Sequence, residues 1–285
     1  MDSKNNPNNY TDSKNNPNEI VSVDGKLKNY LNSVKNSRVD KMPSSYKNLY
    51  LRRTLQVSKY KLPKESQSIL NKFNSISYSN IIKSLPRGFK QKGLIKNNFS
   101  KIKDFLNSGA IMAIKNFHNK HSDVNISKIP LTINIPIGTF RGGRKNASLS
   151  FTYNPKNKKI NTTLWSYSFQ KNFSNKNGSG GTPIGTHIGK LENIGGINKN
   201  VSNSGHAMYG FIMRKRGIDG ELNKNSLNRG ILSHGIVQRR RNLINSGNGS
   251  TTLGCTAYGD MSTANIYKEN KASKYIIEET TYPIL

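Results

Sequence analysis

The sequence predicts an α+β protein, with an N-terminal helical segment followed by a mainly antiparallel β domain. Three observations support this. Before about residue 125 apolar residues recur at near-helical spacing, and from about residue 126 they alternate with polar residues. Glycine- and asparagine-rich segments separate the alternating runs, as turns do in an antiparallel sheet. The chain therefore divides into a tail over residues 1–40, a helical subdomain over 41–125 and a β domain over 126–285.

The tail is polar and of low complexity. Its heptapeptide DSKNNPN occurs at 2–8 and again at 12–18. Such a segment cannot bury enough apolar surface to offset the entropy lost on folding, so we expect residues 1–40 to be disordered. No apolar stretch follows a basic start, so the sequence predicts no secretory signal peptide.

The helical segment is clearest in SKIKDFLNSGAIMAIKNFHNKH, residues 100–121. Five of its apolar residues fall at near-helical spacing: Ile102, Phe105, Leu106, Ile111 and Ile114. Pro63 and the tripeptide PRG at 86–88 separate shorter helical segments before it. We expect a small helical subdomain that packs on the β domain.

The β domain begins with ISKIPLTINIPI, residues 126–137. In this segment alternate residues fall on one face: Ile129, Leu131, Ile133, Ile135 and Ile137. ASLSFTYN at 147–154 and KINTTLWSYSF at 159–169 continue the alternation, so the three runs predict a meander. RGILSHGIV at 229–237 and SKYIIEETTYPI at 273–284 predict two further strands.

The charge of the chain is extreme, with a formal net charge of +30. Such a chain is attracted to polyanions, which include nucleic acids, anionic membranes and anionic cell-wall polymers. The lysines are spread along the whole chain rather than concentrated among aromatic residues, so nucleic acid is not expected as a required partner. No run approaches the ~18 apolar residues of a transmembrane helix, so no transmembrane segment is predicted.

Cys255 is the only cysteine, which excludes an internal disulfide and a zinc site built from cysteines. It lies in GSTTLGCTAYG, residues 249–259, whose small residues leave the thiol accessible. Backbone N–H groups in such a turn also stabilise an oxyanion. Cys255 is therefore a candidate nucleophile, against the alternative of an ordinary loop cysteine. With only 15 acidic residues and no acidic cluster, no metal site is expected, and thiolate chemistry needs no cofactor.

A cysteine nucleophile needs a base to take the thiol proton. His234 is the best candidate among five histidines, because it lies in an apolar strand and is followed directly by Gly235. It precedes Cys255 by 21 residues (255 − 234), enough for the chain to return to a neighbouring strand. His118 and His121 are expected at a solvated helix end, and His187 on a strand surface.

These motifs together resemble the L,D-transpeptidases, the cysteine enzymes of bacterial peptidoglycan. The resemblance is closest to the branch described as the murein L,D-transpeptidase catalytic domain. Three segments carry it, in the family's order and spacing: FSNKNGSGGTPIGTHIG at 173–189, YGFIMRKRGIDGELNKNSLNRGILSHG at 209–235 and TLGC at 252–255. The resemblance covers roughly residues 126–280.

The resemblance implies that Cys255 attacks the carbonyl of the third residue of a stem tetrapeptide and forms a thioester as D-alanine leaves. Resolution by an amine gives a 3→3 crosslink or an exchanged terminus, and resolution by water gives an L,D-carboxypeptidase. His234 would move the protons, oriented by a backbone carbonyl near Gly235 or by the Ser233 hydroxyl. The N–H groups of Gly254 and Cys255 would hold the oxyanion.

On the substrate-binding side the candidates are Arg229, His206, Thr252 and Ser233. Arg229 precedes His234 by five residues, an odd separation that places two strand residues on opposite faces. Arg229 would therefore need a bulge or an early strand start to share the pocket. The resemblance also implies a periplasmic or cell-wall location, reached by a non-Sec route if no signal peptide is present.

Two other functions remain open. The first alternative is a secreted antibacterial effector that uses the same chemistry on the wall of a target cell. The second is a catalytically inactive basic protein that binds cell-wall polymer or nucleic acid.

Overall fold

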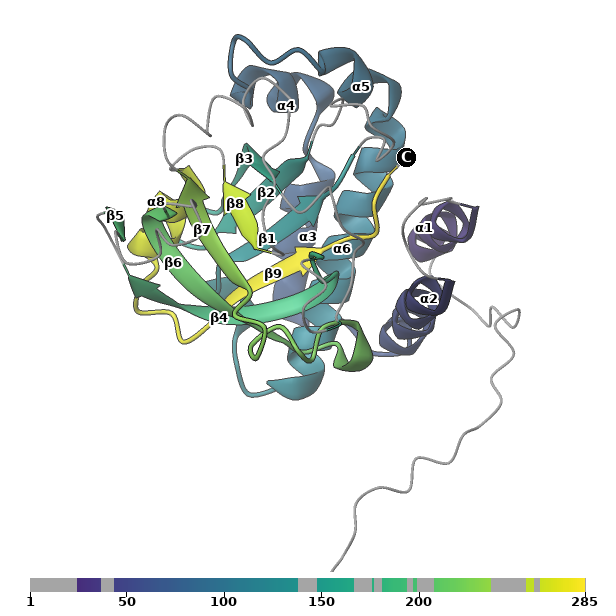
Figure 1. Ribbon diagram of the computed structural model, residues 1–285. Helices are drawn as coiled ribbons and strands as arrows, with labels where there is room; N and C mark the ends of the chain where they lie inside the picture. The colour runs from purple at the N-terminus through teal and green to yellow at the C-terminus, as the bar shows by residue number, and fades with distance from the viewer. Residues whose placement is uncertain are drawn as a thin grey trace, which may run out of the picture.

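A closed β-barrel lies at the centre of the computed structural model, with helices packed around it (Figure 1). The structure describes residues 25–36, 44–137, 148–166, 176, 181–193, 197–198, 208–236, 255–258 and 262–284. The strands are β1 Leu131–Ile135, β2 Leu149–Asn154, β3 Lys159–Ser166, β4 Gly185–Asn193, β5 Ile197–Asn198, β6 Met208–Gly217, β7 Leu232–Ile236, β8 Thr256–Tyr258 and β9 Ile276–Thr280. The α-helices are α1 Gly25–Asn36, α2 Ser44–Ser58, α3 Gln67–Asn74, α4 Tyr78–Ser84, α5 Lys92–Asn97, α6 Phe99–Lys120 and α8 Ser262–Glu269.

The barrel order is β4-β9-β1-β2-β3-β8-β7-β6, and pairing of β6 with β4 closes the circle. The predicted α+β class is confirmed, and so is the meander of β1 to β3. The expected antiparallel β domain is only partly right, because β1 pairs with β9 and β7 pairs with β8 in parallel. Both parallel partners return from distant segments, which the alternation within a strand does not reveal.

Helix α6 packs along the outside of the barrel and is buried on nearly all sides in its middle. Gly109 makes this close approach possible. A Cβ atom at Gly109 would lie 2.9 Å from the Cγ2 atoms of both Ile133 in β1 and Thr281 beyond β9. The helical segment and the barrel therefore share one hydrophobic core.

Helix α1 corrects the predicted extent of the tail. Residues 25–36 fall in the segment expected to be disordered, yet they form a helix that packs on α2 and α6. Leu27, Tyr30 and Val34 are buried, and the Tyr30 ring lies edge-on to Phe105 with ring centroids 4.7 Å apart. This spacing of i, i+3 and i+7 is a helical apolar face that the surrounding lysines and asparagines obscure. The repeats at 2–8 and 12–18 lie outside the described residues.

Polar side chains line the barrel interior, whereas the apolar face of β1 and β2 packs outward against helices. The Thr132 and Thr152 hydroxyls lie 3.0 Å apart, and the Tyr267 hydroxyl of α8 lies 2.8 Å from Thr132. Both threonines and Asn134 are completely buried. Since buried polar groups are costly unless they are hydrogen-bonded, the interior is an ordered polar network rather than an apolar core.

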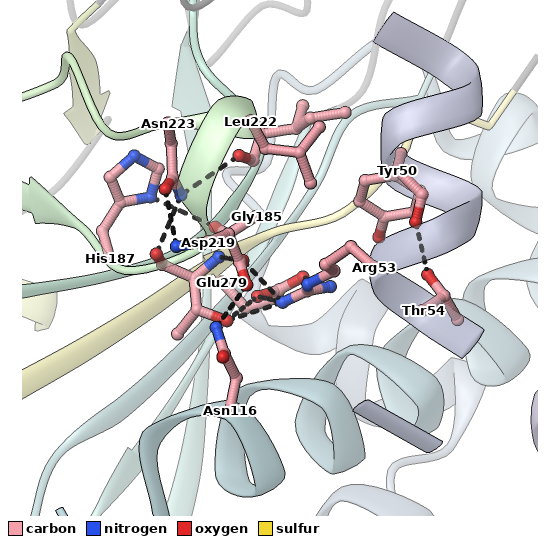
Figure 2. Close-up of polar contacts among 12 residues, drawn as sticks. Tyr50, Arg53, Thr54, Asn116, Gly185, His187, Asp219, Leu222, Asn223 and Glu279 are labelled. Atoms are coloured by element: carbon pink, nitrogen blue, oxygen red, sulfur yellow. Dashed lines mark hydrogen bonds and ion pairs between the residues drawn. The ribbon is translucent and has the colours of Figure 1, made fainter. Parts of the chain in front are cut away.

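A second buried polar cluster joins α2 to the outside of the barrel (Figure 2). The Arg53 guanidinium donates to both carboxylate oxygens of Glu279, at 3.0 and 2.9 Å, and pairs with Asp219 at 2.8 Å. It also donates to the Thr186 hydroxyl at 2.6 Å. Asp219 accepts further hydrogen bonds from the Asn116 amide of α6 and from the Thr186 backbone N–H. Arg53 of α2 thus contacts β4 and β9 directly, and it is linked to α6 through Asp219.

The carboxylates of Glu279 and Asp219 share the Arg53 guanidinium, and this arrangement affects the pKa of Glu279. Burial raises the pKa of Glu279 to about 7, Arg53 acts in the opposite direction, and the nearby Asp219 charge adds to the rise. A buried site with one positive and two negative charges favours retention of a proton on one carboxyl.

Replacement of Arg53 should test how strongly this cluster holds α2 on the barrel. Arg53→Met leaves two buried carboxylates without their cation, so we expect the free energy of unfolding to fall by about 3–5 kcal/mol. Chemical denaturation measures this loss. Arg52→Met, at the exposed neighbouring position, is the matched control and should change stability by less than about 0.5 kcal/mol.

The raised pKa of Glu279 predicts a pH dependence of stability. The folded protein holds this proton up to about pH 7, whereas the unfolded chain releases it near the ordinary value of 4.5. Stability from this group is therefore complete below about pH 4.5 and is lost as the pH rises through about 7. Relative to Glu279→Gln, the wild type should lose on the order of 1–3 kcal/mol between pH 5 and pH 8. Glu65→Gln, at an exposed position, should keep the wild-type pH dependence; the same dependence in Glu279→Gln would contradict the assignment.

Candidate active site

His234 and Cys255 lie on neighbouring parallel strands. In the β7–β8 register, Ser233 pairs with Thr256 and His234 pairs with Ala257. Cys255 directly precedes β8, two positions before Ala257, so its side chain shares a strand face with Ala257 and His234. A strand separation of ~4.8 Å and a rise of ~3.3 Å per residue put the two Cα atoms about 8 Å apart. The fold therefore brings together the predicted nucleophile and base.

The His234 imidazole is held by its own strand. Its Nδ1 atom lies 2.7 Å from the Gly235 carbonyl oxygen, as expected for a backbone carbonyl at this position. A carbonyl only accepts hydrogen bonds, so in the neutral ring Nδ1 carries the proton and Nε2 keeps its lone pair. The ring is buried, which limits its freedom to rotate. The contact thus fixes which ring nitrogen carries the proton in the neutral form.

Cys255 is half-buried, and its surroundings act on the thiol in opposite directions. Burial raises the pKa of the thiol above its ordinary value. A hydrogen bond with the Leu232 backbone and the positive charges of Lys215 and Arg229 lower it, without cancelling the effect of burial. Most of the thiol is therefore protonated at neutral pH, and reaction at Cys255 depends on a base that removes the proton.

Arg229 lies close to Cys255, although its five-residue separation from His234 predicted that it would lie on the opposite strand face. Strand β7 begins only at Leu232, so Arg229 lies in the preceding turn, where strand parity does not apply. Neither a bulge nor an early strand start is involved. Its Nη2 atom donates to the Gly181 carbonyl at 2.5 Å, and its charge interacts with the Cys255 thiol. Gly230, with φ of +63°, ends the turn.

The connection between β6 and β7 is held by residues with no recognisable signal in the sequence. The Asn223 amide donates to the carbonyls of Ile184 at 3.3 Å and Thr186 at 2.8 Å. The Tyr46 hydroxyl of α2 donates to the Leu222 carbonyl at 2.6 Å. Helix α2 and strand β4 thereby position the turn that carries Arg229.

His187 was expected on a strand surface, and the structure corrects this. It lies on β4 and is completely buried, with Nδ1 3.1 Å from the Gly185 carbonyl and Nε2 3.1 Å from the Ser226 hydroxyl. Burial, together with the charge of Lys215, lowers its pKa well below the ordinary value. His187 is therefore neutral and has a structural role.

Ser233 was predicted on the substrate side or as a partner of His234, and the structure corrects both roles. Because it precedes His234, its side chain points to the opposite strand face, into the barrel. There its hydroxyl donates to Glu278 at 2.5 Å, and Glu278 pairs with Lys215 at 2.9 Å. The sequence reasoning missed Lys215 and Glu278, because only the closed barrel places them beside Ser233.

The remaining candidates, His206, Thr252 and Gly254, lie outside the described residues, so their roles stay predictions. Within the described ranges no three side chains of histidine, cysteine, aspartate or glutamate are grouped to hold a metal ion. The described helices include none long and apolar enough to cross a membrane.

Comparison with known proteins identifies no relative. No family model matches the chain, and neither the curated proteins nor the solved structures include a significant match.

The effect of Arg229 on the thiol can be tested without a substrate. Arg229→Gln removes a nearby positive charge, so we expect the pKa of Cys255 to rise and alkylation by iodoacetamide at pH 7 to slow by about two- to fivefold. Arg216→Gln, at an exposed position on β6, is the control and should react like the wild type. If Arg229→Gln is alkylated as fast as Arg216→Gln, Arg229 does not act on the Cys255 thiol.

Proposed function

We propose that the protein is a cysteine-dependent acyltransferase of the L,D-transpeptidase type that acts on peptidoglycan stem peptides. One observation carries the proposal: the parallel pairing of β7 with β8 puts Cys255 and His234 on one face of adjacent strands. The motif order around these residues, which resembles that family, supplies the substrate class. The mixed barrel is proposed to be this protein's version of the family's catalytic domain.

The proposed reaction begins with transfer of the Cys255 proton to Nε2 of His234. The thiolate attacks the carbonyl carbon of the third stem residue, and the C–N bond to D-alanine breaks. His234 returns the proton to the leaving amine, and a thioester to Cys255 remains. An amine or water then attacks the thioester and restores the thiol. The hydrogen bond from Nδ1 to the Gly235 carbonyl supports this role, because it orients the ring and stabilises its protonated form.

Arg229 is proposed to hold a carboxylate of the stem peptide. Its guanidinium is only half-buried, lies near Cys255 and is anchored to the Gly181 carbonyl. Guanidinium groups bind carboxylates through paired, charge-assisted hydrogen bonds.

The basic composition supports an anionic setting for this chemistry. A net charge of +30 would retain the protein on sacculi and associated anionic polymers, with no requirement for nucleic acid. We therefore propose that it acts at the cell wall or in the periplasm.

Muropeptide analysis tests the proposal directly. Sacculi from several species are incubated with the wild type or with Cys255→Ala, digested, and analysed by mass spectrometry. We expect the wild type alone to consume tetrapeptides, and His234→Gln to lower the rate by at least about 10²-fold. Tripeptides indicate hydrolysis, 3→3 dimers indicate crosslinking, and altered termini indicate exchange.

The contrary result is equally clear. Identical muropeptide profiles for the wild type and Cys255→Ala on every substrate would refute the proposed activity. Binding to sacculi or DNA that weakens steeply with salt would then identify an inactive basic binding protein.

A further inference from the structure

The residues that flank Cys255 and His234 are joined to each other on the inner side of the barrel. Thr256, the first residue of β8, directly follows Cys255. Ser233 directly precedes His234, and both lie in β7. The Lys215 ammonium donates to the Thr256 hydroxyl at 3.1 Å and pairs with Glu278 at 2.9 Å. Glu278 in turn accepts from the Ser233 hydroxyl at 2.5 Å. A continuous chain of polar contacts thus runs beneath the site from one strand to the other.

Both charged members of this chain are completely buried. Lys215 is 1% exposed and Glu278 is not exposed at all. Taking such a pair out of water costs several kcal/mol per ion, and apolar residues of similar volume commonly replace it without loss of stability. Stability alone does not account for a buried ion pair, so its place beneath two reactive side chains points to a role in the site.

The Glu278 carboxylate is held in one orientation by further partners. Its Oε1 atom accepts from the hydroxyls of Tyr258 at 2.9 Å and Tyr267 at 2.7 Å, while Oε2 accepts from Ser233 and Lys215. The pKa of Glu278 is lowered despite its burial, by Lys215 and by these hydrogen bonds, so the group stays charged. The contact points on β7 and β8 are therefore fixed.

We propose that Lys215 and Glu278 are positioning residues for Cys255 and His234, which they hold in register through Thr256 and Ser233. The inference rests on the proposed function in treating Cys255 as the nucleophile. It goes beyond that function by giving the barrel interior a part in the reaction.

Lys215 also acts on the thiol electrostatically. The charged and titratable groups that face Cys255 in the described part of the chain are Lys215 from β6, Arg229 from the turn before β7, and His234 from β7. Both cations lower the pKa of the thiol. A charge inside the barrel therefore assists proton removal on its outer face.

The test combines thiol titration with muropeptide turnover. Lys215→Met with Glu278→Gln removes both charges and leaves neither ion unpaired. We expect iodoacetamide alkylation of Cys255 to shift to higher pH, with a rate at pH 7 lowered roughly five- to tenfold. Lys115→Met removes a lysine that is also buried but contacts the Ser58 carbonyl, and this control should keep the wild-type pH profile.

Thr256→Val provides a second variant that is nearly the same shape and leaves both charges in place. It removes only the contact between Lys215 and β8, so we expect a near-normal alkylation profile with muropeptide turnover lowered roughly three- to tenfold. A wild-type alkylation profile in the folded double variant, or full turnover in Thr256→Val, would overturn the inference.

Failure of the inference and failure of the proposed function give different results. Alkylation reports on the thiol with no peptidoglycan present. A shifted profile in the double variant, without turnover by the wild type, refutes the function and retains the link between Lys215 and Cys255. Turnover by the wild type, with an unshifted alkylation profile in the double variant, retains the function and refutes the link between Lys215 and Cys255.

Discussion

Two adjacent glutamates on β9 are the constraint on which the rest of this structure depends. Glu278 and Glu279 are both completely buried, and strand alternation points them to opposite faces of the barrel wall. Glu278 pairs with Lys215 inside the barrel, and Glu279 pairs with Arg53 outside it. The chain has only 15 acidic residues against 45 basic ones. Pairing with these two buried carboxylates allows Lys215 and Arg53 to be buried as cations.

Each glutamate organises a different part of the candidate site. The outer cluster of Glu279, Arg53 and Asp219 attaches α2 to the barrel, and α2 supplies Tyr46 to the turn that carries Arg229. The inner pair of Glu278 and Lys215 underlies the strands that carry His234 and Cys255. Because β9 contributes to both, the site is supported from its two sides by one short strand.

The polar interior also explains how a chain with 33% hydrophobic residues forms a stable barrel. The apolar residues of β1 and β2 lie on the outer face of the barrel, where they form one hydrophobic core with the apolar residues of α6. Threonine, asparagine and tyrosine side chains line the interior, where hydroxyl and amide groups bond to one another. The apolar core that the barrel shares with the helices and the hydrogen-bonded interior together form the packed part of this domain.

The sequence by itself determined the local features: the helix at 99–120, the meander of β1 to β3, and Cys255 and His234 as the residues to examine. These follow from periodicity and from the chemistry of side chains in their immediate neighbourhood. Helix α1 was missed because its apolar face is narrow among lysines and asparagines. The roles of Arg229, His187, Ser233, Lys215 and Glu278 were decided only by the tertiary structure. Strand order, parallel pairing and the point where a strand begins depend on contacts between distant segments, and a period of two along one strand carries no information about its neighbours.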